Sequence, residues 1–254
     1  RLRAVALTDH DTLEGIPEAQ IAADRNGIEL IPGTELSLDY DKGGMHLLVL
    51  WLEPVSGPLQ DRLAGLQVGR DERNARIVDR LNELGLTITL EEVLEEAGEG
   101  SVGRPHIAAV MMRRGHVDSM EQAFTEYLGN GKQAYVGRER LGPREAIQLA
   151  RASGGVPILA HPHTLGIDNR FEMADLLADL CAHGLIGIEC HYGTYPADGR
   201  TGMVALAGRF GLLPSGGSDY HGTYKSDVGL GLGRVGIPVP DGILDDLRHF
   251  AVPA

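Results

Sequence analysis

The sequence contains little cysteine: Cys181 and Cys190 are its two cysteines among 254 residues. They have neither the spacing of a zinc finger nor the density of a disulfide framework, so both classes of small stapled domain are excluded. We expect two reduced thiols in the core of a cytoplasmic protein. No apolar run approaches the roughly 20 residues of a membrane helix, and no signal peptide opens the sequence. The composition therefore predicts a soluble protein without membrane partners.

Basic residues are also few. Lys and Arg number 23 against 36 Asp and Glu, which gives a net charge of -13. This balance argues against a broad basic face that grips nucleic acid, and duplex DNA is not expected as a partner. A small nucleotide or the end of a short oligoribonucleotide suits such a protein better. Any phosphate substrate then needs a local positive site, which bound divalent cations would supply.

Short apolar runs alternate with helical stretches in two parts of the chain, residues 1–56 and 140–254. This alternation predicts an α/β fold with a largely parallel sheet or barrel, whose active site lies at the C-terminal strand ends. Residues 57–139 differ, because they contain long charged stretches with apolar residues at helical spacing. We interpret them as a helical subdomain inserted into the barrel domain.

Nearly every apolar run with strand character contains or ends in a His, Asp or Glu residue. Imidazoles mixed with carboxylates suit Zn, Mn or Fe, and a glutamate can bridge two ions through its two oxygens. Two such ions can activate water and hold both oxygens of an in-line displacement at phosphorus. The pattern predicts a metal-dependent phosphoesterase whose ligands are His10, Glu35, His46, His161, Asp219 and His221.

The individual ligands differ in the support they have from spacing. Asp219 and His221 stand at positions i and i+2 of an extended segment and point to the same side. His46 lies in a strand that could place it on either face. His161 directly ends an apolar run, which favours it over His163. The remaining histidines are interpreted as structural or surface residues: His116, His183 and His249.

Five motifs in one order resemble the PHP (polymerase and histidinol phosphatase) family of metal phosphoesterases. They are Thr8-Asp9-His10-Asp11, Pro32-Gly33-Thr34-Glu35, His46, Ala160-His161-Pro162 and Gly217-Ser218-Asp219-Tyr220-His221. Two further segments resemble the family's branch of nucleoside 3',5'-bisphosphate phosphatases and 5'-3' oligoribonucleotide exonucleases. These segments are Gly103-Arg104-Pro105-His106 and the stretch from Ala123-Phe124 to Tyr135-Val136.

The resemblance implies a distorted (β/α)7 barrel that holds three ions of Mn, Zn or Fe. It implies that Glu35 bridges two ions, that His46 and His161 hold one of them, and that Asp219 helps to hold the other. His10 and His221 would serve the third ion. The family's opening His-x-His motif has no counterpart in this sequence, whose first residue is Arg1. We therefore expect an N-terminally trimmed sequence whose barrel lacks the first strand.

The expected reaction is hydrolysis of a nucleotide phosphate by metal-activated water, with Glu35, His161 and Asp219 as catalytic residues. The substrate would be the 3'-phosphate of a nucleoside 3',5'-bisphosphate or the 5'-end nucleotide of a short oligoribonucleotide. A guanidinium matches phosphate oxygens, so Arg104 and Arg138 are candidates to clamp a second phosphate, or else they are solvated surface residues. His106 would assist recognition or cap a helix. His191 would bind metal or contact phosphate.

Three alternatives remain open from the sequence. Many amidohydrolases bridge their metals with a carboxylated lysine, but none of Lys42, Lys132 and Lys225 directly ends an apolar run. A histidinol phosphatase would belong to the same family, although the helical insertion disfavours it. A non-catalytic remnant would act as a structural or partner-binding module. The oligomeric state is not predicted.

Overall fold

The computed structural model describes residues 2–98, 101–222, 227–231, 233–234, 236 and 238–251. The chain forms two compact units. The sheet unit comprises Arg1–Arg62 and Arg140–Ala254, and the helical unit comprises Leu63–Glu139. Among the described residues, no helix is both long and apolar enough to cross a membrane.

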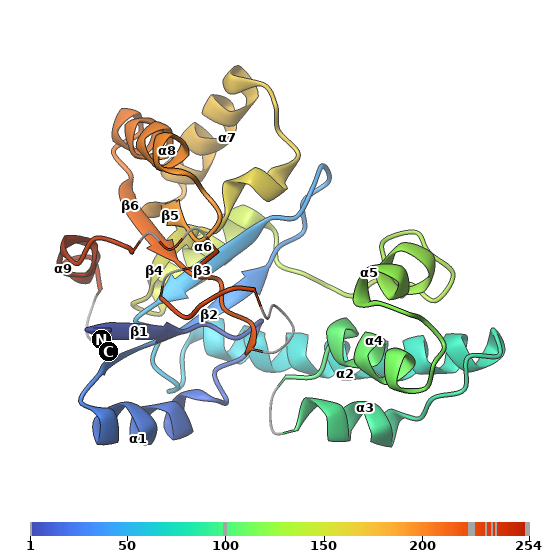
Figure 1. The fold of residues 1–254 in the computed structure, drawn as a ribbon. Helices are drawn as coiled ribbons and strands as arrows, with labels where there is room; N and C mark the ends of the chain where they lie inside the picture. Colours follow the sequence, from blue (N-terminus) through green and yellow to red (C-terminus); the bar gives the residue numbers. More distant parts are fainter. Residues whose placement is uncertain are drawn as a thin grey trace. The chain divides into compact units, whose positions relative to one another are not determined.

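The sheet unit has an α/β fold built on one curled, half-barrel sheet of six described strands (Figure 1). The order of the strands across the sheet is the same as their order in the chain. Their bounds are β1 Ala4–Leu7, β2 Glu29–Ser37, β3 His46–Leu50, β4 Val156–Leu159, β5 Gly187–Tyr192 and β6 Leu213–Gly217.

The sheet is more mixed than the sequence predicted. β1 and β2 are parallel, and so are β4, β5 and β6, but β3 is antiparallel to both of its neighbours. The reason is the short connection between β2 and β3: a parallel pair needs a crossover of a dozen or more residues, whereas a short loop reverses the chain. This reversal decides where His46 lies.

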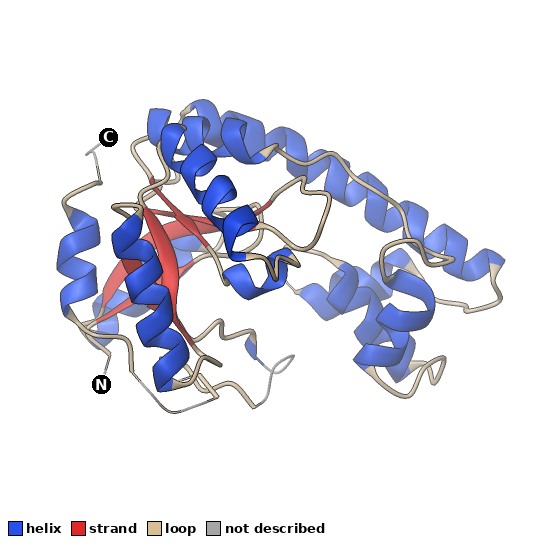
Figure 2. Cartoon of the chain, turned by 90° about the horizontal axis from the view of Figure 1, so that it is seen from above, coloured by secondary structure: helices blue, strands red, loops and turns tan. Residues whose placement is uncertain are grey.

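Helices cover the sheet, as Figure 2 shows in blue around the red strands. α1 packs against β2, α6 against β3 and β4, α8 against β5 and β6, and α9 against β6. Gly27 ends α1 with a left-handed φ of 61°, a conformation that glycine adopts at little cost. The bounds are α1 Ile16–Asn26, α6 Pro143–Ala152, α7 Arg170–Ala182, α8 Ala197–Arg209 and α9 Gly242–Arg248, with a short 3-10 turn at Pro162–Leu165.

Close backbone packing at Gly33 brings β2 and β3 together. A Cβ atom on Gly33 would lie 2.6 Å from the Val49 carbonyl oxygen, closer than real contacts allow. β4 is buried along its whole length, as expected for a strand with cover on both faces. The centre of the sheet is therefore closely packed.

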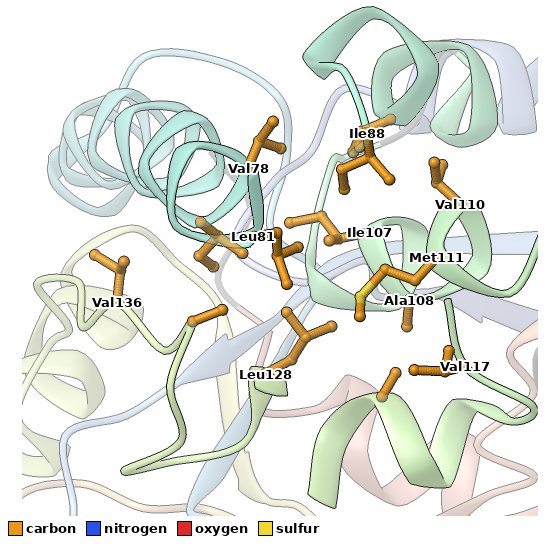
Figure 3. Close-up of a cluster of buried hydrophobic side chains, with 14 of the residues drawn as sticks. Val78, Leu81, Ile88, Ile107, Ala108, Val110, Met111, Val117, Leu128 and Val136 are labelled. Atoms are coloured by element: carbon orange, nitrogen blue, oxygen red, sulfur yellow. The ribbon is translucent and has the colours of Figure 1, made fainter. Parts of the chain in front are cut away.

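The helical unit has its own hydrophobic core (Figure 3). α2, Pro58–Glu83, begins in the sheet unit and continues into the helical unit. Residue 57, the predicted start of the insertion, lies just before this helix. The further elements are α3 Leu90–Ala97, α4 Arg104–Arg113, α5 Met120–Ala123 and a π-helical turn at Phe124–Leu128.

Candidate metal centre

Three neighbouring strands bring predicted ligands to one edge of the sheet. β2 carries Glu35 near its C-terminal end, and β3 begins at this edge with His46, because Ser37 pairs with His46 in the antiparallel register. β4 ends at the same edge, where the Ala160 amide donates to the His46 carbonyl over 3.1 Å. The antiparallel course of β3 thus places the start of that strand beside the ends of its neighbours.

Glu35 lies at the centre of this group. Its Oε1 atom is 2.6 Å from His46 Nδ1 and 3.0 Å from His161 Nε2. The two ring nitrogens are 3.2 Å apart. His10 pairs with Glu35 as an isolated bridge, and one donor atom each of His10, Glu35 and His46 lies within 4.8 Å of the others. Four of the six predicted ligands therefore converge.

The electrostatics of the group follow from this convergence. Burial by itself would raise the pKa of Glu35, but hydrogen bonds with His161 and His46 and the attraction of His10 hold that pKa well below its usual value. Burial would lower the pKa of His161, yet the contact with Glu35 outweighs it and raises that pKa. The buried negative charge at Glu35 is thus stabilised by partners that are themselves metal ligands in many proteins.

The backbone of His161 is held in an uncommon conformation. Its φ of 24° is positive, which is rare outside glycine and is found often at functional sites. Its amide donates to Glu189 Oε2 over 2.7 Å, and its Nδ1 atom lies 3.1 Å from Thr164 Oγ1. The contact of Nδ1 with Thr164 leaves Nε2 directed at Glu35. Metal-binding histidines are commonly oriented in this way, by a hydrogen bond at the ring nitrogen that does not bind the metal.

Asp219 and His221 follow β6 and adjoin the first group. Asp219 also has a positive φ of 52°, and Tyr192 donates its hydroxyl to Asp219 Oδ2 over 2.8 Å. His221 Nδ1 lies 2.9 Å from the Asp219 carbonyl oxygen. The His221 ring centroid is 6.1 Å from that of His10, which in turn lies 5.1 Å from that of His46. The structure therefore brings all six predicted ligands into one neighbourhood.

This donor set fits divalent transition metals. Imidazole nitrogens and carboxylate oxygens together suit Zn, Mn or Fe. Two of the six residues are buried, with Glu35 6% and His161 7% exposed, and the other four are half-buried. The burial of Glu35 and His161 strengthens the case for a metal site, because clusters of exposed acidic groups are common in proteins that bind no metal there.

The helical unit contains three of the four predicted substrate contacts. Arg104, His106 and Arg138 belong to the helical unit. Arg104 donates to the Leu128 carbonyl over 3.0 Å, and its guanidinium lies 5.7 Å from the Phe124 ring centroid. The Gly103 amide donates to His106 Nδ1 over 3.0 Å, which is the capping contact that the sequence analysis named as its alternative role.

The residues interpreted as structural have local partners. His183 Nδ1 lies 2.8 Å from the Asp179 carbonyl, His249 Nδ1 2.7 Å from the Asp245 carbonyl, and His116 Nε2 3.0 Å from the Thr87 carbonyl. Lys42 pairs with Glu172. Lys225 lies outside the described residues.

Two residues at the site were not predicted from the sequence. Glu189, 4% exposed, accepts the His161 amide, and Tyr192 bonds Asp219. The signal for Glu189 was present, because it directly follows the apolar run that ends at Ile188. The residue predicted from this segment was His191. It pairs with Gly216 of β6, where an added Cβ atom would stand 2.5 Å from the His191 Cβ.

The fold and the site together define a metal-dependent phosphoesterase. No family model matches the chain. It is 34% identical to the 5'-3' exoribonuclease of Haemophilus influenzae over 220 residues, which cover 87% of this chain and 80% of that protein. It is 31% identical to the 3',5'-nucleoside bisphosphate phosphatase of Chromobacterium violaceum over 228 residues, which cover 89% of this chain and 80% of that protein.

A solved structure agrees with these relatives. A protein of Bifidobacterium adolescentis described as a metal-dependent phosphoesterase superposes with a TM-score of 0.85 at 29% identity, covering 99% of this chain and 87% of that one. The chain belongs to the PHP family of metal-dependent phosphoesterases. A second solved structure, a protein of Chromobacterium violaceum described as an amidohydrolase, superposes with a TM-score of 0.82 at 29% identity, covering 98% of this chain and 87% of that one. The sequence relatives, an exoribonuclease and a nucleoside bisphosphate phosphatase, favour phosphoester hydrolysis over the amidohydrolase alternative.

Proposed function

We propose that the chain hydrolyses the 3'-phosphate of nucleoside 3',5'-bisphosphates and removes 5'-end nucleotides from short oligoribonucleotides. The observation that carries the proposal is the contact of one Glu35 oxygen with both His46 and His161. The support for the substrates is that the two relatives are a 5'-3' exoribonuclease and a nucleoside bisphosphate phosphatase. Glu35, His161 and Asp219 are the proposed catalytic residues.

The ligands for divalent ions are the six residues at the sheet edge, with Glu35 as the bridge. Bound ions supply Lewis acidity, which acidifies water and offsets the charge of a phosphate. The chain itself contributes a buried carboxylate and oriented imidazoles. The net charge of -13 repels a phosphate from most of the chain. A phosphate would therefore meet a favourable field only where cations are bound.

The complete fold and metal content extend this proposal. We expect three ions of Mn, Zn or Fe and a distorted (β/α)7 barrel. Among the described strands, β1 and β6 each have one neighbour in the sheet, so both have an edge at which a further strand can pair. Of the four predicted substrate contacts, Arg104 and His106 have the structural partners described above. All four residues, Arg104, His106, Arg138 and His191, stay proposed substrate contacts.

The test offers three substrates to Mn-loaded protein: a nucleoside 3',5'-bisphosphate, histidinol phosphate and a 5'-phosphorylated oligoribonucleotide. We expect release of inorganic phosphate from the first, nucleotides from the third, and little turnover of the second. Turnover of histidinol phosphate alone would overturn the substrate assignment. Failure of all three, with metal bound, would favour the non-catalytic alternative.

A further inference from the structure

β5 is irregular at the point where it passes the metal centre. Glu189 pairs with Ser215 of β6, but the next pair joins His191 to Gly216, so Cys190 is an extra residue in β5. In a regular strand, residues 189 and 191 would share a face. An extra residue reverses the alternation beyond it, so Glu189 and Tyr192 both reach the metal centre. This irregularity also places His191 opposite Gly216.

β5 lies between the two strands that deliver His161 and Asp219, namely β4 and β6 (Figure 1). From this central position Glu189 accepts the His161 amide over 2.7 Å, and Tyr192 donates to Asp219 Oδ2 over 2.8 Å. The Tyr192 ring also meets the His161 ring edge to face, with centroids 5.8 Å apart. One strand therefore contacts predicted ligands on both sides of it.

Both of these ligand residues have positive φ angles, 24° for His161 and 52° for Asp219. Such backbone conformations are strained and persist where the surrounding structure holds them. The contact from Glu189 acts directly on the strained backbone, since it engages the amide of His161. The contact from Tyr192 acts on the side chain of Asp219.

We propose that Glu189 and Tyr192 are positioning residues of the metal centre, brought to it by the extra residue in β5. Glu189 holds the backbone of His161, and Tyr192 fixes the carboxylate of Asp219. The role proposed for Glu189 is orientation, since its Oε2 atom accepts a hydrogen bond from the His161 amide. This inference rests on the proposed metal site.

The experiment measures Mn²⁺ affinity of the chelator-treated full chain by titration calorimetry. Tyr192→Phe removes a hydroxyl and retains the ring, so we expect affinity to fall about 10- to 100-fold, the usual effect of losing a partner of a metal ligand. Tyr195→Phe is the matched control. It removes a hydroxyl that lies 2.9 Å from His163 Nδ1, and we expect it to leave affinity unchanged.

Glu189 is tested with two variants. Glu189→Ala removes the acceptor for the His161 amide and should weaken Mn²⁺ binding to the same degree as Tyr192→Phe. Glu189→Gln keeps an acceptor oxygen and should restore most of the affinity. Circular dichroism and thermal unfolding of each metal-free variant separate this effect from a general loss of structure. If Glu189→Ala does not fold, the comparison of Glu189→Gln with Tyr192→Phe remains.

Three outcomes would overturn the inference. Wild-type affinity in Tyr192→Phe and Glu189→Ala would show that neither residue positions a ligand. An equal loss in Glu189→Gln and Glu189→Ala would show that Glu189 acts through its charge, as a ligand does. Absence of Mn²⁺ binding by the unaltered chain would overturn the proposed function together with this inference, and so distinguishes the two failures.

Discussion

Glu35 and His161 are separated by 126 residues, yet Glu35 Oε1 and His161 Nε2 lie 3.0 Å apart. β2 and β4 do not pair directly, because β3 lies between them. His46, at the start of β3, places its Nδ1 atom 2.6 Å from the same carboxylate oxygen. One oxygen atom of Glu35 thus contacts residues that three neighbouring strands bring together. Replacing this carboxylate by the neutral amide of glutamine is therefore the sharpest single test of the metal centre.

We expect Glu35→Gln to reduce both Mn²⁺ affinity and kcat/KM at least about a hundredfold, since bound ions contribute several kcal/mol to such reactions. The fold should persist, because glutamine has nearly the same shape. Mass spectrometry of the metal content checks the loss of Mn²⁺ binding, and circular dichroism checks that the fold persists. Glu29→Gln is the control, the same change at the exposed opposite end of β2, where Glu29 pairs with Arg248. Retained turnover in Glu35→Gln would remove the bridging role.

The orientation of His46 gives a second prediction. His46→Asn should weaken Mn²⁺ binding at least about tenfold, because it removes an imidazole from the centre. His249→Asn provides a matched control, since His249 is an exposed histidine in the same unit that bonds the Asp245 carbonyl over 2.7 Å. Calorimetric titration of both variants checks the expectation. Equal affinities would exclude His46 from the ligand set.

His46 also shows what the sequence could and could not predict. The motifs indicated the ligands themselves, because most of them stand at or near one end of an apolar run. The face of the strand could not be predicted, since it depends on pairing between residues far apart in the chain. The structure settles the orientation through the antiparallel register that sets His46 opposite Ser37. The alternation of strands and helices predicted the α/β class, but a direction reversal at β3 depends on the short loop that precedes it.

Glu189 and His191 show a second limit. Regular alternation puts both residues on one face, so neither can be preferred from spacing alone. The extra residue at Cys190 separates them, and it arises from the pairing with β6. Irregularities of this kind depend on contacts between strands and leave little trace in local sequence. The ligand residues of the site could therefore be predicted from their motifs, whereas Glu189 and Tyr192, which contact two of these ligands, could not.

Gly33 should tolerate no side chain. Gly33→Ala would place a Cβ atom 2.6 Å from the Val49 carbonyl oxygen, and we expect the free energy of unfolding to fall by about 1–3 kcal/mol. Gly202→Ala is the contrasting change. Gly202 lies within α8 with open space around it, so alanine should stabilise by about 0.5–1 kcal/mol. Urea unfolding of both variants measures the two shifts. Equal stabilities would contradict the close approach of β2 and β3.

Arg104 is expected to stabilise the helical unit. Its guanidinium bonds the Leu128 carbonyl and lies 5.7 and 5.8 Å from the ring centroids of Phe124 and Tyr135. Arg104→Lys loses the planar fork, and we expect a loss of about 1–2 kcal/mol in unfolding free energy. Arg113→Lys, at an exposed pair with Glu96, should change stability little. A raised KM with unchanged stability in Arg104→Lys would instead indicate a substrate contact.

The cysteines give a prediction that depends on pH. Burial raises the pKa of the Cys190 thiol to about 12 and also raises that of Cys181. The thiolate is the reactive form, so at pH 8 nearly all of Cys190 is the unreactive thiol, and the reactive fraction rises steadily as the pH increases toward the pKa. Iodoacetamide should therefore modify Cys190 slowly in the native protein and rapidly in urea, as followed by mass spectrometry.

Cys181→Ser isolates the signal of Cys190 in this experiment. Fast native labelling at pH 8 would contradict the burial of Cys190. Because Cys190 is the extra residue of β5, its labelling rate also reports on opening of the strand that carries Glu189 and Tyr192. If bound Mn²⁺ tightens the contacts of that strand with His161 and Asp219, labelling of Cys190 should slow further when the metal is added. The same reagent thereby links the packing of β5 to the occupancy of the metal centre.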